Sequence, residues 1–562
     1  MVGRLITQGK KILNSQQNTV LSAAGVIMIM IIASRILGLV RQRVLANFFA
    51  PGELSLFFAA FRLPDTIFEV LVFGTFASAF IPIFTKNLKV DKNKAWELGG
   101  LILNWGGLIF LVLATVVIIF AHPLYRIITP GFGQVDQETI ANLARILFAA
   151  QGFFVLSYVL TAVLESSKRF LVPALAPIFY NLGIIVFTIV FSGNFHLMAP
   201  VLGVVVGAGL HFLVQLPLAI KLGFRFSMNL KITPDVKKIA KLAMPRILEV
   251  SFLQIAKFVE LSLATLISIP AYTFFTFGNS IQLIPVGLFG TSIAKAALPT
   301  LARQADDLAK FKKTLFETLN QVVFLMAPVA AFLIVARIPV VRLVFGTDLF
   351  TWESTVQTSL VVSAFAVGVF SQAANSILAR SFYALHDTKT PVMVSIGTLT
   401  LNIVLDVIFV YLLKLPVWSL AAAFSFASIL QSVILFGLIV RKIDNGAKRL
   451  FYIPVIKSLV SASVSGLLMF LILKFFDRSV WIKKLSFITY TNLPFEKFVL
   501  DTRYATNLII LTTIVGVAGI VVYMMVSYLL KSSELKTLIG LIKKTINRQK
   551  YSIEPHDVLD IP

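Results

Sequence analysis

The chain has 562 residues, of which 58% are hydrophobic and only 14% are charged. A soluble globular chain has about a quarter of its residues charged, so this composition excludes an ordinary soluble domain. The absence of cysteine excludes disulfides, thiolate metal sites and cysteine nucleophiles. The net charge of +24 is better explained by basic loops that meet anionic lipid head groups than by nucleic acid, so we expect no nucleic-acid partner.

Apolar runs of about 20 residues recur along the chain, and this length spans a ~30 Å hydrocarbon core. The expected fold class is therefore an all-α polytopic membrane protein with about fourteen transmembrane helices. The predicted spans are 19–43, 54–86, 95–121, 138–166, 173–193, 197–221, 236–268, 272–302, 312–337, 355–385, 390–413, 417–440, 452–475 and 505–530.

The charges of the loops predict the orientation. If the N-terminus is inside, connections such as Lys86–Lys94, Lys221–Lys241 and Arg441–Arg449 are cytoplasmic, and they are rich in Lys and Arg. The outer connections are mostly short and poor in both, apart from the long, mixed-charge segment Phe476–Ala505. The positive-inside rule then places both termini in the cytoplasm of a multi-pass protein. We interpret the first span as uncleaved rather than as a signal peptide.

A faint internal repeat suggests two halves. Lys168–Pro173 precedes a span with Asn181, and Asp387–Pro391 precedes a span with Asn402. Duplicated halves with a site between them are a common plan of transporters. The predicted parts are a cytoplasmic N-terminal segment (1–18), an N-lobe with helices 1–6 (19–225), a C-lobe with helices 7–12 (226–450), helices 13–14 (451–530) and a cytoplasmic tail (531–562).

No motif indicates covalent chemistry. The chain lacks a phosphate-binding Gly-rich loop with its Lys, an HExxH motif and a GxSxG nucleophile turn. We therefore expect no enzyme, no catalytic residue, no organic cofactor and no self-contained ATP-driven pump. A transporter of this kind would depend on an ion gradient, the membrane potential or a partner.

Charges inside the spans are the candidate functional residues. Arg35 and Arg41 lie in the first span, where a charge costs roughly 2.5–3.5 kcal/mol unless it faces water or a partner. They are about 120° apart around a helix, so both can border a wide aqueous cavity. The alternative, which is stronger for Arg41 than for Arg35, is that the side chain snorkels to the outer head groups.

The second and seventh spans carry further charges. Arg62, Asp65 and Glu69 lie at helical spacing, either as a self-neutralising row or with Arg62 facing an anion-binding cavity. Pro64 is expected to kink this helix. Lys257 and Glu260 are three residues apart and can pair.

The eleventh span carries two polar side chains in an apolar run. Asn402 and Asp406 are four residues apart and share one helix face. An acid and an amide one turn apart supply hard oxygen ligands of the kind a sodium ion needs. A hydrogen-bonded contact between helices is the alternative.

Several motifs resemble the MurJ/MviN family of lipid II flippases. The N-terminal motifs are Ser34–Arg41, Phe57–Pro64 and Ala79–Ile83. The later ones are Arg169–Pro177 with Tyr180-Asn181, Gln215–Pro217, Pro285–Gly290 with Leu298-Pro299, and Phe382–Pro391. The resemblance covers residues 20–440, and the last two helices agree only in kind.

The resemblance implies two six-helix lobes in a V around a central cavity, with helices 13–14 forming a groove for a lipid tail. It implies that lipid II, an undecaprenyl-pyrophosphate-linked disaccharide-pentapeptide, is flipped from the inner to the outer leaflet of the bacterial cytoplasmic membrane for peptidoglycan synthesis. The expected partners are lipid II, membrane lipids and cell-wall synthesis proteins.

The family's functional residues carry over only in part. Arg35, Arg41 and Arg62 match its basic cavity set, and we expect Lys257 to compensate for the cations that are missing. The sodium site of some members matches Glu260, Asn402 and Asp406 in type and spacing. The driving force is thus open between Na⁺ and the membrane potential.

Four positions depart from the family pattern. Gln42 and Ser55 stand where acidic residues are usual, and Phe68 and Ser280 stand where cavity arginines are usual. These departures leave two alternatives open. One is an exporter of another polyprenyl-linked glycan or of a drug, and the other is a transport-inactive membrane scaffold for cell-wall synthesis.

Overall fold

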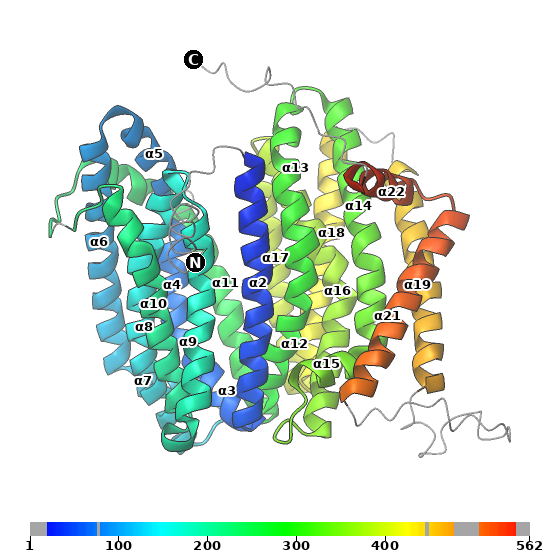
Figure 1. Ribbon diagram of the computed structural model, residues 1–562, viewed down its shortest axis with the longest axis horizontal. Helices are drawn as coiled ribbons and strands as arrows, with labels where there is room; N and C mark the ends of the chain where they lie inside the picture. The colour runs from blue at the N-terminus through cyan, green and yellow to red at the C-terminus, as the bar shows by residue number, and fades with distance from the viewer. Residues whose placement is uncertain (1–19, 76–78, 227, 444–448, 477–504, 547–562) are drawn as a thin grey trace, which may run out of the picture. The chain divides into compact units, whose positions relative to one another are not determined.

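The computed structural model describes residues 20–75, 79–226, 228–443, 449–476 and 505–546. All regular elements of this described part are helices, which confirms the predicted all-α fold (Figure 1). Twelve of its helices are long and apolar enough to cross a membrane, and they coincide with the third to fourteenth predicted spans. The N-terminal segment 1–18 and most of the predicted outer segment Phe476–Ala505 lie outside the described residues.

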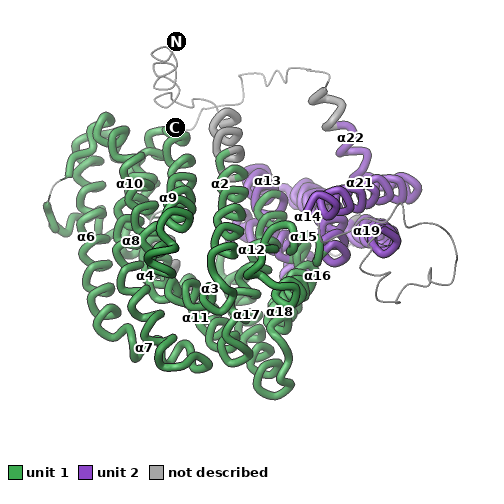
Figure 2. Tube along the Cα trace, turned by 60° about the horizontal axis from the view of Figure 1, so that its bottom comes forward, with its two compact units in different colours: residues 1–288, 337–371, 388–434 green, residues 289–336, 372–387, 435–562 purple. Residues whose placement is uncertain are grey.

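The chain forms two compact units, coloured separately in Figure 2. Unit 1 comprises Met1–Leu288, Arg337–Ser371 and Thr388–Ile434, and unit 2 comprises Phe289–Ala336, Gln372–Asp387 and Leu435–Pro562. The helices of unit 1 are α2 (Val20–Phe48), α3 (Pro51–Ala60), α4 (Arg62–Thr75), α5 (Ile81–Val90), α6 (Lys92–Ile119), α7 (Ala121–Ile128), α8 (Gln134–Ser166), α9 (Leu171–Phe195), α10 (Met198–Lys221), α11 (Pro234–Ile267), α12 (Ala271–Pro285), α15 (Arg337–Phe345) and α17 (Lys389–Val407).

The helices of unit 2 are α13 (Ser292–Arg303), α14 (Leu308–Val335), α19 (Arg449–Phe476), α21 (Ala505–Leu529) and α22 (Ser533–Ile546). Two long helices, α16 (Trp352–Ala384) and α18 (Trp418–Ile443), contribute residues to both units. Two short π-helical segments, η2 (Val286–Thr291) and η3 (Ile408–Leu412), continue α12 and α17.

The predicted continuous span 54–86 is divided. α3 ends at Ala60, Phe61 forms a turn, and α4 starts at Arg62. We expected a kink at Pro64. The interruption lies at Phe61, three residues earlier, and Pro64 lies in the first turn of α4, where its missing N–H has no helical partner to lose. The eighth predicted span is interrupted by η2 directly after Pro285, since a proline removes a helical hydrogen bond and favours such a bulge.

Close backbone contact joins α9 to α10 within unit 1. A Cβ atom added at Gly183 would lie 2.6 Å from the Cα of Gly207, so a side chain there would collide with the facing helix. Small residues that let helices approach are typical of membrane bundles. α2 packs on α9, while α4 packs on α8 and α11, and α11 also packs on α17. These pairings bring the charged spans of unit 1 together.

Candidate functional site

α4 carries a polar stripe that faces three neighbouring helices. Arg62, Asp65 and Glu69 lie at positions i, i+3 and i+7 of this helix and share one side of it. Arg62 Nη2 donates to the hydroxyl of Tyr272 on α12 at 3.1 Å. Asp65 Oδ1 accepts from Gln151 Nε2 on α8 at 2.5 Å. The stripe therefore forms interhelical hydrogen bonds.

Glu69 is the third member of the stripe, and its partners lie on α11. Its Oε2 accepts from Lys257 Nζ at 2.8 Å and also from Gln254 Nε2. Thr66, one turn earlier on α4, lies 3.5 Å from Gln254 Oε1 through its hydroxyl. Lys257, which we expected to face the substrate, is thus neutralised by a carboxylate in this conformation.

Arg35 and Arg41 lie on α2 as predicted. The guanidinium of Arg41 lies over the ring of Tyr180 on α9, with 5.8 Å between its carbon and the ring centroid. Its Nε is buried and has no hydrogen-bond partner within the described part of the chain. Arg35 is exposed. Among the described side chains, no carboxylate pairs with either arginine.

Asn402 and Asp406 form a buried pair on α17. They are 1% and 0% exposed, and Asn402 Nδ2 donates to Asp406 Oδ2 at 3.0 Å. The Oδ1 atoms of both residues are buried without a partner among the described residues. Glu260, on the adjacent α11, interacts electrostatically with Asp406. One orphaned amide oxygen and one orphaned carboxyl oxygen beside a second carboxyl group are a donor set that suits a hard cation such as Na⁺.

Two residues that depart from the family pattern form a hydrogen bond with each other. Gln42 Nε2 on α2 donates to Ser280 Oγ on α12 at 2.7 Å. Gln42 is buried, and its Oε1 has no partner in the described part of the chain. Phe68, another departure, packs in a cluster of aromatic rings with Phe154 and Tyr158 of α8. These positions therefore have neutral contacts here.

Hydrogen bonds also link α2 and α3 to elements far along the chain. Ser55 Oγ lies 2.9 Å from Thr273 Oγ1, and Thr273 N donates to Ser55 Oγ at 3.0 Å. Arg43 Nη1 donates to the carbonyl of Leu343 at 2.7 Å, and Thr347 Oγ1 to that of Ala46 at 2.7 Å. All of these bonds join residues of the predicted N-lobe (19–225) to residues of the predicted C-lobe (226–450), and all lie within unit 1.

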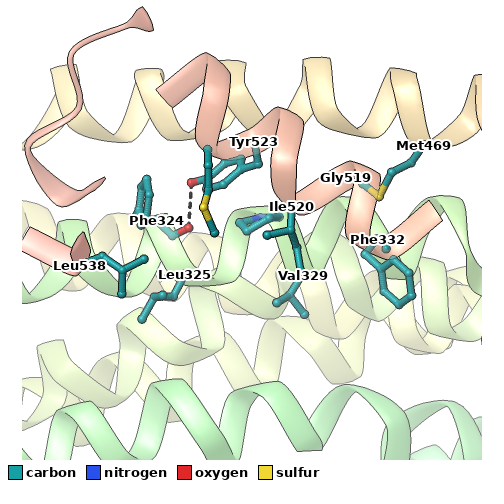
Figure 3. Close-up of a pocket in the computed structure, with 12 residues that line it drawn as sticks. Phe324, Leu325, Val329, Phe332, Met469, Gly519, Ile520, Tyr523 and Leu538 are labelled. Carbon is teal, nitrogen blue, oxygen red and sulfur yellow. Dashed lines mark hydrogen bonds between the residues drawn. The ribbon is translucent and has the colours of Figure 1, made fainter. Parts of the chain in front are cut away.

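Unit 2 contains an apolar groove of about 320 Å³ between α14, α19, α21 and α22 (Figure 3). Phe324 and Phe332 line it from α14, Met469 from α19, and Ile520 and Tyr523 from α21. The Tyr523 hydroxyl is satisfied by the carbonyl of Phe324 at 2.8 Å, so no free polar group of that ring points into the groove. α22 reaches the same groove through Leu538.

Sequence reasoning missed the neutral members of the site, namely Gln151, Tyr180, Gln254 and Tyr272. Two of them left a signal. Gln151 and Gln254 are amides inside apolar runs, and Gln254 is three residues before Lys257, on the same helix face. Tyr180 was quoted only as part of a motif, and neither tyrosine lies at a spacing that indicates a contact with an arginine.

These features define a class: a polytopic helical membrane transporter whose cations and carboxylates lie on facing helices of one bundle. Two solved structures share the fold. One is "Lipid II flippase MurJ, inward closed conformation", with a TM-score of 0.71 and 23% identity, covering 90% of this chain and 98% of that one. The other is an inward-facing multidrug resistance MATE family transporter of the MOP superfamily, with a TM-score of 0.60 and 13% identity, covering 73% and 94%.

The sequence comparisons give the family. The family model described as "Lipid II flippase MurJ" matches residues 44–491, and the chain belongs to this family. The probable lipid II flippase MurJ of Buchnera aphidicola subsp. Acyrthosiphon pisum is 29% identical over 390 residues, which are 66% of this chain and 75% of the relative. The lipid II flippase MurJ of Burkholderia cenocepacia is 27% identical over 398 residues, or 68% and 76%.

Proposed function

We propose that this protein flips lipid II from the inner to the outer leaflet of the bacterial cytoplasmic membrane, with both termini in the cytoplasm. Family membership supports the substrate, and the basic connecting loops support the orientation. The protein acts as a transporter without covalent chemistry. Lipid II binds through its pyrophosphate, and the two lobes expose the bound head group to each side in turn.

The observation that carries the proposal is the pair Arg35 and Arg41 on α2. In the part of the chain that the structure describes, no carboxylate neutralises either arginine, and the buried Nε of Arg41 has no hydrogen-bond acceptor. Guanidinium groups match phosphate oxygens in geometry and charge, so these two are the primary pyrophosphate ligands. Arg62 and Lys257 join them when their present partners release them.

Coupling to Na⁺ rests on Glu260, Asn402 and Asp406. An ion bound by these oxygens would tie α11 to α17, and its release would let the two helices separate. The membrane potential can drive the same cycle, because moving a charged head group or ion across it is worth about 2.3 kcal/mol per charge per 100 mV.

The groove of unit 2 accommodates the isoprenoid tail. Its lining is almost entirely hydrocarbon and aromatic, and a polyprenyl chain offers no polar group to such a surface. Helices α19 and α21 are the predicted helices 13 and 14, so the groove lies where the resemblance implies a lipid-tail site.

A bacterium whose own lipid II flippase is depleted tests the proposal. Expression of this chain should restore growth and the appearance of lipid II in the outer leaflet. If the chain reaches the membrane in normal amount and neither returns, the proposed function is wrong. An exporter of cationic drugs would instead confer drug resistance, which the cationic side chains of α2 argue against.

A further inference from the structure

Glu69 forms the charged contact between α4 and α11. A single carboxylate oxygen accepts from both Lys257 and Gln254. Gln254 is only 2% exposed, whereas the side chains of Lys257 and Glu69 are 38% and 28% exposed. The amide contact is therefore sealed, while the ion pair lies at its edge, where a charged ligand can reach it.

The charges around this contact oppose an anion as long as Lys257 stays paired with Glu69. Arg62 and Lys257 contribute +2 and Asp65, Glu69 and Glu260 contribute −3, so the group has a formal charge of −1. All three carboxylates interact electrostatically with Arg62, and Glu69 and Glu260 also interact with Lys257. An approaching anion is repelled while Glu69 holds Lys257, and it gains a strong donor once Lys257 is released.

We propose that the Glu69–Lys257 pair is an anion-exchange latch, which rests on the proposed function. The phosphate oxygens of a polyprenyl pyrophosphate replace Glu69 as the hydrogen-bond acceptor of the Lys257 ammonium group. The carboxylate of Glu69 is then left without its cation and is repelled by the bound pyrophosphate. The contact between α4 and α11 becomes weaker as a result. Lys257 is a ligand of the substrate in this scheme, and Glu69 is a positioning residue that competes with the substrate for it. Binding of the pyrophosphate is thereby linked to opening of the α4–α11 contact.

Binding of farnesyl pyrophosphate to the purified full-length chain in neutral detergent tests the latch by calorimetry. E69Q removes the competitor, so the dissociation constant should fall about two- to fivefold, the range that a half-exposed ion pair supplies. K257Q removes the ligand, so the constant should rise by a similar factor, and K257R should stay close to the original protein. Farnesol, which lacks the phosphates, should show none of these shifts.

Opposite shifts in the two variants are the decisive result. An ion pair that only holds two helices together would change binding in the same direction in E69Q and K257Q, and that result would overturn the latch. The control is D307N, which removes another ion pair, the one that Asp307 forms with Lys310 at 2.9 Å in unit 2. It should leave binding unchanged.

Two further measurements separate the possible failures. Phosphatidylglycerol carries a single phosphodiester, and equal competition by this lipid would overturn the assignment to a pyrophosphate. Flipping of lipid II is measured on the same preparations. Active flipping with shifts in the same direction refutes the latch alone, whereas an original protein that flips no lipid II refutes the proposed function itself.

Discussion

Gln42 on α2 donates a 2.7 Å hydrogen bond to Ser280 on α12, so two positions at which the family usually has an acid and an arginine contact each other here as a neutral pair. The two departures therefore compensate each other. A single charge at either position would be left without its partner in a mostly buried place, which costs several kcal/mol.

This relationship predicts the outcome of restoring the charges. Q42D and S280R should each lower the thermal unfolding midpoint in detergent, because each introduces one unpaired charge. The double variant Q42D/S280R should recover most of the loss, since the new charges can pair. A double variant that is no more stable than the worse single variant would show that the two positions are not coupled.

Arg41 should be needed for fast transport. R41A removes a charged donor, and charge-assisted hydrogen bonds contribute about 1.5–3 kcal/mol, so the initial rate of lipid II flipping should fall about ten- to a hundredfold. R41K should retain part of the rate. Arg145 provides the control, because it is an exposed arginine that bonds to Asn142 and to the carbonyl of Ile118. If R145A and R41A behave alike, the special role of Arg41 is refuted.

The buried pair on α17 should control any dependence on sodium. D406N lowers the negative charge of the three-oxygen set, so binding of ²²Na⁺ and stimulation of flipping by Na⁺ should both disappear. Thr400 lies on the same helix and bonds only to the carbonyl of Ile396 among the described residues, so T400A should behave like the original chain. Flipping that is equally fast when K⁺ replaces Na⁺ would remove the sodium site from the mechanism.

The groove should discriminate substrates by the length of their tail. Ile520 lines it and is 52% exposed, so I520W places a large ring in the space for the isoprenoid chain. Flipping of lipid II should slow, while a short-chain analogue should be flipped as before. Ile509 lies on the same helix at the same exposure of 52% but outside the groove, so I509W is a matched control. Equal losses with both substrates would contradict a tail site.

The fold was largely predictable because membrane helices are recognisable in a sequence as long apolar runs. The third to fourteenth predicted spans all coincide with described helices. The pair Asn402–Asp406 was predictable for a related reason, since a spacing of four residues on one helix guarantees proximity.

Contacts between helices were not predictable in the same way. Spacing alone allowed Lys257 to pair with Glu260 and allowed Arg62, Asp65 and Glu69 to neutralise one another. Their hydrogen-bond partners lie on other helices, because rotation and tilt decide which side chains meet, and those are set by packing. The division of the second span at Phe61 turns this stripe toward α8, α11 and α12.

The most direct test of alternating access by this chain is a reversible cross-link between α3 and α12. Ser55 and Thr273 are short side chains whose hydroxyls are 2.9 Å apart, so cysteines at both positions are close enough for a disulfide, and the chain has no other cysteine. Proteoliposomes with S55C/T273C should flip fluorescent lipid II when reduced, stop on oxidation and resume on reduction. Flipping that continues unchanged in the fully cross-linked protein, or that never exceeds protein-free liposomes, would contradict transport of lipid II by separation of these helices.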